Sequence, residues 1–193
     1  MMQAQRSLIF GGARSGKSAH AEQLAAASGK PVIYIATATG AEHADSEMQE
    51  RIVQHQQRRQ QDHPRWSTVQ EPLALGAAIT RHSRADNLLL VDCLTVWLSN
   101  LLFSTQQDYP EIGRITPPAR FVQERAALLE ALRTLPGDIV LVSNEVGMGI
   151  VPMGAISRWF VDEAGRLNQA IAAQCERVHW VAAGLPLSLK GGV

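Results

Sequence analysis

The sequence predicts one α/β domain in which a mostly parallel β-sheet carries helices on both faces and a phosphate-binding loop follows the first strand. Three observations support this fold. Short leucine-rich or β-branched runs alternate with helical stretches along the 193 residues, as in parallel strand–helix units. The run Leu-Leu-Leu-Val at 88–91 is continuously apolar, which suits a strand buried on both sides. Residues 11–18 read Gly-Gly-Ala-Arg-Ser-Gly-Lys-Ser.

The elements follow from hydrophobic periodicity. Strands are expected where short apolar runs are bounded by polar or turn residues, at 8–10, 32–36, 67–69, 88–91, 139–142 and 178–182. Helices are expected where apolar residues recur every three or four positions, at 17–27, 47–61, 73–82, 95–103, 119–135 and 156–173. Three prolines and Gly113 between 105 and 118 predict an irregular connector. A chain of this length forms one domain, spanning 1–193.

Composition restricts the function classes. Lysine plus arginine and aspartate plus glutamate each number 18, so the formal net charge is zero and no global feature indicates a nucleic-acid or acidic-membrane partner. Cys93 and Cys175 stand in apolar contexts, are expected to be reduced, and are too few for a zinc site. No signal peptide or transmembrane segment is apparent, and a cytoplasmic location is expected.

The run at 11–18 matches the phosphate-loop pattern, with Gly11, Gly16, Lys17 and Ser18 at the defining positions. The strand Leu-Ile-Phe precedes it and a helix follows, which is the context that the pattern requires. Backbone N–H groups would surround the phosphates, Lys17 would reach the β/γ-phosphates, and the hydroxyl of Ser18 would bind Mg²⁺. A glycine turn that happens to precede a helix is the alternative.

Asp92 ends the apolar run at 88–91. An acid at the carboxyl end of a buried strand is the usual partner of a phosphate loop, where it holds Mg²⁺ directly or through water. The alternative role of Asp92 is to cap the helix expected from Thr95.

Arg51, His55, Arg58 and Arg59 form a basic cluster in the helix predicted over 47–61. Spacings of three and four residues place the guanidinium groups beside the imidazole of His55. Neighbouring cations favour the neutral imidazole, which could attack an α-phosphate and form a phosphoramidate. A solvated polar helix face with an incidental histidine is the alternative, and composition alone favours it.

Two further segments carry polar residues. Asn144 and Glu145 follow a strand, where sheets of this type place site residues, but a glycine-containing turn explains the segment equally well. Arg158, Asp162 and Arg166 are spaced at i,i+4 on a later helix, so a structural face of Arg158–Asp162 and Asp162–Arg166 ion pairs is the stronger interpretation.

Five segments together resemble one family, the bifunctional adenosylcobinamide kinase/adenosylcobinamide-phosphate guanylyltransferases of cobalamin synthesis. The segments are the phosphate loop at 11–18, Tyr-Ile-Ala-Thr at 34–37, Arg-Ile-x-x-His-x-x-x-Arg at 51–59, Asn-Glu-Val-Gly-Met-Gly-Ile-Val-Pro at 144–152 and Phe-x-Asp-x-Ala-Gly-Arg-x-Asn-Gln at 160–169. The phosphate loop alone is shared by many families, whereas the order and spacing of all five segments is specific to this one.

The resemblance implies a RecA-like fold, a homotrimer and two reactions. Adenosylcobinamide is phosphorylated with ATP or GTP, and GMP is then transferred from GTP to adenosylcobinamide phosphate through a guanylylated histidine, which corresponds to His55. Lys17 and His55 would be catalytic, and Ser18 and Asp92 would hold Mg²⁺. The implied nucleotide contacts are Gly11, Gly12, Ala13, Arg14, Ser15, Gly16, Lys17, Ser18, Thr37, Ala38, Thr39, Gln56, Gln57, Arg58, Arg59, Glu71 and Asp92.

Two other functions remain compatible with the sequence. One is a simple phosphate-loop metabolite kinase in which the arginine-rich helix only covers the phosphates. The other is a nucleotide-dependent regulatory or binding protein without metabolite turnover.

Overall fold

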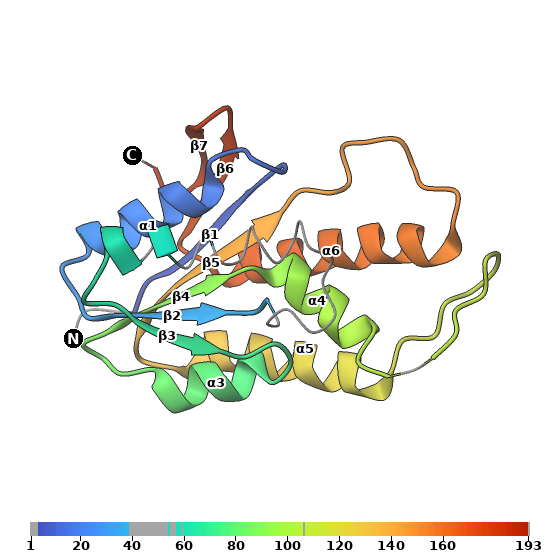
Figure 1. Cartoon of the computed structure of the whole chain (residues 1–193), viewed down its shortest axis with the longest axis horizontal. Helices are drawn as coiled ribbons and strands as arrows, with labels where there is room; N and C mark the ends of the chain where they lie inside the picture. The colour runs from blue at the N-terminus through green and yellow to red at the C-terminus, as the bar shows by residue number, and fades with distance from the viewer. Residues whose placement is uncertain (1–3, 39–53, 55–56, 59, 106, 193) are drawn as a thin grey trace.

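The computed structural model describes residues 4–38, 54, 57–58, 60–105 and 107–192 (Figure 1). A seven-stranded sheet is arranged in the order β3-β2-β4-β5-β1-β6-β7. The strands are β1 (Arg6–Gly11), β2 (Val32–Ala36), β3 (Ser67–Gln70), β4 (Leu88–Asp92), β5 (Asp138–Asn144), β6 (Arg177–Ala182) and β7 (Leu185–Lys190). The strands β1 to β6 are parallel, and β7 runs antiparallel to β6. The predicted mostly parallel sheet is confirmed.

The described helices are α1 (Lys17–Ala27), α3 (Leu75–His82), α4 (Leu94–Leu102), α5 (Ala119–Thr134) and α6 (Ala155–Gln174). Their ends agree with the predictions to within one or two residues. The helix expected over 47–61 falls mostly outside the described residues, although Gln54, Gln57 and Arg58 are helical.

The core has two layers, one on each face of the sheet. Alternating side chains of a strand enter opposite layers, so Leu8 packs with α3 to α6 while its neighbour Ile9 packs with Ala21 and Ala25 of α1. Figure 1 shows α1 separated by the sheet from α3, α5 and α6. The continuous apolar run of β4 is explained by this arrangement, because both of its faces are covered.

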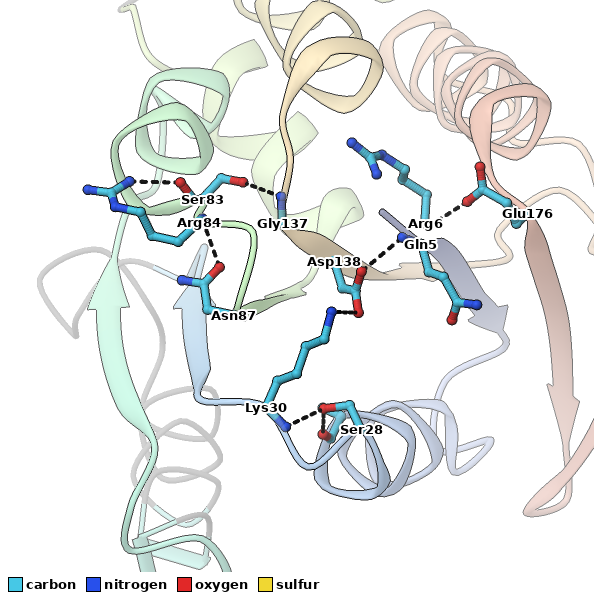
Figure 2. Close-up of polar contacts among 11 residues, drawn as sticks. Gln5, Arg6, Ser28, Lys30, Ser83, Arg84, Asn87, Gly137, Asp138 and Glu176 are labelled. Carbon is cyan, nitrogen blue, oxygen red and sulfur yellow. Dashed lines mark hydrogen bonds and ion pairs between the residues drawn. The ribbon is translucent and has the colours of Figure 1, made fainter. Parts of the chain in front are cut away.

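A polar network closes the amino-terminal edge of the sheet (Figure 2). The carboxylate of Asp138 accepts hydrogen bonds from the backbone N–H of Gln5 at 2.9 Å and from Nζ of Lys30 at 2.7 Å. Glu176 accepts from the backbone N–H of Arg6 at 2.6 Å, and Ser83 Oγ accepts from the N–H of Gly137 at 2.9 Å. These contacts join the starts of neighbouring strands. They lie at the edge of the sheet opposite the one that carries the phosphate loop.

The sequence analysis missed β7. Its residues are all exposed, so the strand lacks the buried apolar pattern by which the others were recognised. A two-residue turn joins it to β6, with φ of 52° at Ala183 and 79° at Gly184. Positive φ at both central residues is typical of a type I′ hairpin turn, but alanine is an unusual residue there, so the turn carried a weak signal.

The described part of the connector between α4 and α5, residues 103–105 and 107–118, lacks regular structure, as predicted, but it is attached to the domain. The hydroxyl of Tyr109 donates to the carbonyl of Leu102 at 2.6 Å, and Ile115 is buried.

Candidate nucleotide-binding and phosphotransfer site

The phosphate loop joins β1 to α1, and two of its glycines are required by the geometry. A Cβ atom at Gly11 would lie 2.2 Å from the carbonyl oxygen of Val181, because β6 passes directly beside the loop. Gly16 precedes α1 with a φ of 93°, a conformation that favours glycine. The loop therefore delivers the amino terminus of α1, with its unpaired N–H groups and positive dipole end, to the carboxyl edge of the sheet.

The β6–β7 turn supports this loop from outside. The backbone N–H of Gly184 donates to the carbonyl of Ser15 at 2.8 Å, and a Cβ atom at Gly16 would lie 3.0 Å from Cα of Gly184. The side chain of Ser15 is buried, and its Oγ has no hydrogen-bond partner among the described residues. The turn that leads into β7, the strand that the sequence analysis missed, therefore holds the backbone of the phosphate loop in place.

Lys17 of the phosphate loop and Asp92 at the end of β4 interact electrostatically. Nζ of Lys17 donates to the carbonyl of Gly12 at 3.1 Å. Burial lowers the pKa of Lys17, and the negative charge of Asp92 opposes that change. Oδ2 of Asp92 accepts a hydrogen bond from the hydroxyl of Tyr34 at 3.0 Å. The loop lysine and the strand-end acid therefore influence each other electrostatically, and their predicted roles in phosphate and Mg²⁺ binding stay predictions.

A second set of hydrogen bonds joins the ends of β2, β4 and β5. The hydroxyl of Thr37 donates to the carbonyl of Cys93 and accepts from its N–H, both at 2.8 Å. Nδ2 of Asn100 donates to the carbonyl of Thr37 at 2.7 Å, and Nδ2 of Asn144 donates to Oγ1 of Thr95 at 2.5 Å. The hydroxyl of Thr37 is fully buried in this role, so its predicted nucleotide contact stays a prediction.

Glu71 directly follows β3. Its Oε1 accepts hydrogen bonds from the backbone N–H groups of Leu73 at 3.0 Å and Ala74 at 2.8 Å, immediately before α3. One carboxylate oxygen is therefore engaged in the local chain turn, and the predicted nucleotide contact of Glu71 also stays a prediction.

A cavity of about 670 Å³ lies beside the phosphate loop, and Arg58 and Gln54 line it together with the loop and Glu22. Arg58 is exposed, and its Nε lies 3.2 Å from Oδ2 of Asp62. The structure thus brings one guanidinium of the predicted basic cluster to the loop that would hold the phosphates. Gln57, one residue earlier, is exposed and Ala38 is half-buried.

The remaining members of the predicted site lie outside the described residues. They are Thr39, Arg51, His55, Gln56 and Arg59. Their predicted roles stay predictions.

The predicted ion pairs on α6 are replaced by other contacts. Nη1 of Arg166 lies 2.5 Å from Oε1 of Glu163, at i−3 rather than from Asp162 at i−4. Nη1 of Arg158 donates to the backbone carbonyls of Pro152 and Met153. In both cases the guanidinium group contacts an oxygen other than those of Asp162.

The described residues contain no cluster of three or more histidine, cysteine or acidic side chains that could enclose a metal ion by themselves. A phosphate-loop site does not need one, because a strand-end carboxylate and a loop hydroxyl suffice when phosphate oxygens and water complete the coordination. Asp92 and Ser18 are the predicted pair, and their role as Mg²⁺ ligands stays a prediction. Both cysteines are free and buried, as predicted, and no described helix is long and apolar enough to cross a membrane.

Comparison with known proteins agrees with this geometry. The sequence profile described as "CobU: Cobinamide kinase / cobinamide phosphate guanyltransferase" matches residues 7–189. The chain is 53% identical over 186 residues to the bifunctional adenosylcobalamin biosynthesis protein CobP of Pseudomonas aeruginosa, covering 96% of this chain and 98% of that protein. It is 38% identical over 185 residues to the bifunctional adenosylcobalamin biosynthesis protein CobU of Escherichia coli K12, covering 95% and 98%.

A solved structure shows the same fold at low sequence identity. The ATP synthase subunit NeqB of Nanoarcheaum equitans superposes with a TM-score of 0.51 at 16% identity, covering 94% of this chain and 48% of that one. This likeness concerns the fold alone. The match of the family profile to nearly the whole sequence shows that the chain belongs to the cobinamide kinase / cobinamide phosphate guanyltransferase family.

Proposed function

We propose that this chain performs both reactions of its family. It phosphorylates the hydroxyl of adenosylcobinamide with ATP or GTP, and it then transfers GMP from GTP to adenosylcobinamide phosphate with release of pyrophosphate. The observation that carries the proposal is the meeting of Lys17, the amino terminus of α1 and Asp92 at one edge of the sheet, in a chain that matches the family along nearly its full length.

The phosphoryl-transfer step depends on positioning and charge. The unpaired N–H groups at the start of α1 and the ammonium group of Lys17 bind the β- and γ-phosphates and stabilise the charge that develops during transfer. Ser18 and Asp92 would hold Mg²⁺, which would neutralise phosphate charge. Asp92 also favours the protonated form of Lys17 by opposing the effect of burial on its pKa.

The guanylyl-transfer step uses His55 as the nucleophile, as the family resemblance implies. A neutral imidazole nitrogen attacks the α-phosphate of GTP, and pyrophosphate leaves. Arg58 supports this assignment, because it belongs to the same predicted helix turn as His55 and lines the cavity beside the phosphate loop. We further propose a cytoplasmic homotrimer, in line with the family resemblance.

The test uses two labelled nucleotides on the purified full-length chain. Label from the γ-position of ATP should appear in adenosylcobinamide, and label from the α-position of GTP should appear in the protein as an adduct that is acid-labile and base-stable. Lys17→Ala should lower phosphoryl transfer on the order of 10²-fold or more, whereas Lys190→Ala, on the exposed strand β7, should not.

Each competing function predicts a different result. A simple metabolite kinase would transfer the γ-label and retain no α-label. A regulatory nucleotide-binding protein would bind both nucleotides, transfer neither label and release no pyrophosphate.

A further inference from the structure

The end of β5 lies between the two strands that carry the phosphate site. The sheet order places β5 between β1 and β4. Asn144, the last residue of β5, is in register with Gly11, and Val142 is in register with Asp92. The backbone N–H of Glu145 donates to the carbonyl of Gly11 at 2.9 Å. The backbone of Glu145 therefore lies directly beside Gly11, the first glycine of the phosphate loop.

The carboxylate of Glu145 is held but not fully engaged. Its Oε1 accepts a hydrogen bond from the backbone N–H of Gly147 at 2.5 Å, which restrains the side chain over its own turn. The other oxygen, Oε2, has no hydrogen-bond or ion-pair partner among the residues described. The residue is half-buried and so is not enclosed by the protein.

Two other carboxylates end or follow strands at the same edge, and both are engaged elsewhere. Asp92 accepts from Tyr34 and interacts electrostatically with Lys17, and it is the proposed Mg²⁺ ligand. Glu71 accepts from two backbone N–H groups before α3, at the far end of the sheet beyond β2. Of these three acids, Glu145 is the one that follows a strand paired with β1 and that is assigned neither to Mg²⁺ nor to the turn before α3.

The segment that follows Glu145 has the surface that a large organic acceptor requires. Figure 1 shows the chain leaving the end of β5 in a wide excursion before it returns as α6. This excursion exposes five apolar side chains, those of Val146, Met148, Ile150, Val151 and Met153. It also borders a cavity of about 290 Å³ lined by Leu102, Phe103, Val146, Pro152 and Phe160. An exposed apolar patch beside a phosphate site marks a binding surface, and methionine adapts well to irregular ligands.

We propose that Glu145 is the catalytic base of the kinase step and that the apolar segment after it, residues 146–153, supports the corrinoid acceptor. This inference rests on the proposed function, which provides an alcohol on a bulky macrocycle as the acceptor. The hydroxyl oxygen forms a bond to the γ-phosphorus while its proton moves to Oε2 of Glu145. The bond from the γ-phosphorus to the bridging oxygen breaks, and the electron pair leaves with the nucleoside diphosphate. Glu145 then returns the proton to water.

The two reactions of the family need this base unequally. The kinase acceptor is an alcohol, which must lose a proton as it is phosphorylated. The guanylyl acceptor is a phosphate that is already ionised near neutral pH, so its oxygen attacks without losing a proton. A carboxylate that serves as a base is therefore required for the first reaction only, whereas one that merely shapes the nucleotide site would affect both.

The experiment compares Glu145→Gln with the wild-type chain in the two reactions measured separately, with adenosylcobinamide and ATP in one and adenosylcobinamide phosphate and GTP in the other. We expect kcat of the kinase step to fall on the order of 10²-fold or more, with little change in KM for ATP, and guanylyl transfer to change far less. The acid limb of the kinase pH profile should be lost in Glu145→Gln and partly restored in Glu145→Asp. Glu111→Gln removes an exposed carboxylate from the connector before α5 and should leave both reactions unchanged.

Three outcomes overturn the inference. Equal losses in both reactions, with an unchanged circular dichroism spectrum and melting temperature, would make Glu145 a residue that positions the nucleotide. Unchanged kinase turnover in Glu145→Gln would exclude it as the base. A wild-type chain with no kinase activity would overturn the proposed function and this inference together, whereas the first two outcomes leave the proposed function standing.

Discussion

Nε2 of His20 lies 2.8 Å from Nδ1 of His179, and this contact joins the helix after the phosphate loop to β6 across 159 positions of sequence. The two rings are tilted at 34° with centroids 5.1 Å apart. One of these nitrogens must donate the hydrogen bond and the other must accept it with an unprotonated nitrogen, so the pair requires at least one neutral imidazole. The contact therefore couples the position of α1 to pH.

Acidification should weaken the fold through this pair. Burial lowers the pKa of both histidines, assisted at His20 by His179 and at His179 by Arg177. Unfolded histidine titrates at about 6.5, so below that pH the unfolded chain binds protons that the folded pair resists. The stabilising contribution is complete above the unfolded pKa and decreases as pH falls through the lower folded values.

Urea unfolding between about pH 7 and pH 5 measures this contribution. As the pH is lowered, the free energy of unfolding should decrease more steeply in the wild type than in His179→Gln, because glutamine cannot be protonated at that position. His82→Gln, a change at the end of α3 away from the pair, serves as the control. Identical slopes in the wild type and His179→Gln would show that the pair contributes nothing to the pH dependence.

The charge of Asp92 should set the alkaline limit of catalysis. Burial lowers the pKa of Lys17 and Asp92 raises it, so Asp92→Asn should lower that pKa further. We expect kcat/KM for ATP, which reports on the free enzyme, to decline at a lower pH in Asp92→Asn than in the wild type. The variant should also need more Mg²⁺. Tyr34→Phe removes the hydrogen bond to Asp92 but keeps the carboxylate charge, and its alkaline limb should not move downward.

His55→Ala should separate the two activities. Guanylyl transfer and the covalent GMP adduct should disappear, because no nitrogen remains to attack the α-phosphate. The kinase step should survive at least in part, since it depends on the phosphate loop and on positioning. An acid-labile, base-stable adduct in His55→Ala would point to another nucleophile, with His43 and His63 the next to test. Loss of both activities in a folded variant would instead mean that His55 seats the nucleotide for both steps.

Two glycine substitutions in helices should have opposite effects on stability. A Cβ atom at Gly76 in α3 would lie 2.7 Å from the carbonyl carbon of Ala127 in α5, at the place where the two helices pack. Gly76→Ala should therefore destabilise the fold by about 1–3 kcal/mol through overpacking. Gly165 in α6 has nothing within 4 Å of such a Cβ atom, so Gly165→Ala should stabilise by roughly 0.5–1 kcal/mol through helix propensity. Chemical denaturation tests both, and a stabilising Gly76→Ala would contradict the close approach of α3 and α5.

Local chemistry in the sequence determined most of the secondary structure and the centre of the site. The strands β1 to β6 and the described helices were predicted, because burial of a strand or of a helix face requires a periodic apolar pattern. The phosphate loop was recognised because its glycines, lysine and serine are contiguous. Asp92 was recognised because it ends an apolar run. The strand β7 was missed because an exposed edge strand has no burial pattern to leave in the sequence.

Relationships between segments distant in sequence were decided only by the tertiary structure. His20 meets His179 because β6 lies beside β1. The sequence could place Asn144 and Glu145 after a strand but could not distinguish a site from a turn. Glu145 adjoins Gly11 because β5 is inserted between β1 and β4. Strand order is a collective result of packing the whole core, and no local pattern encodes it.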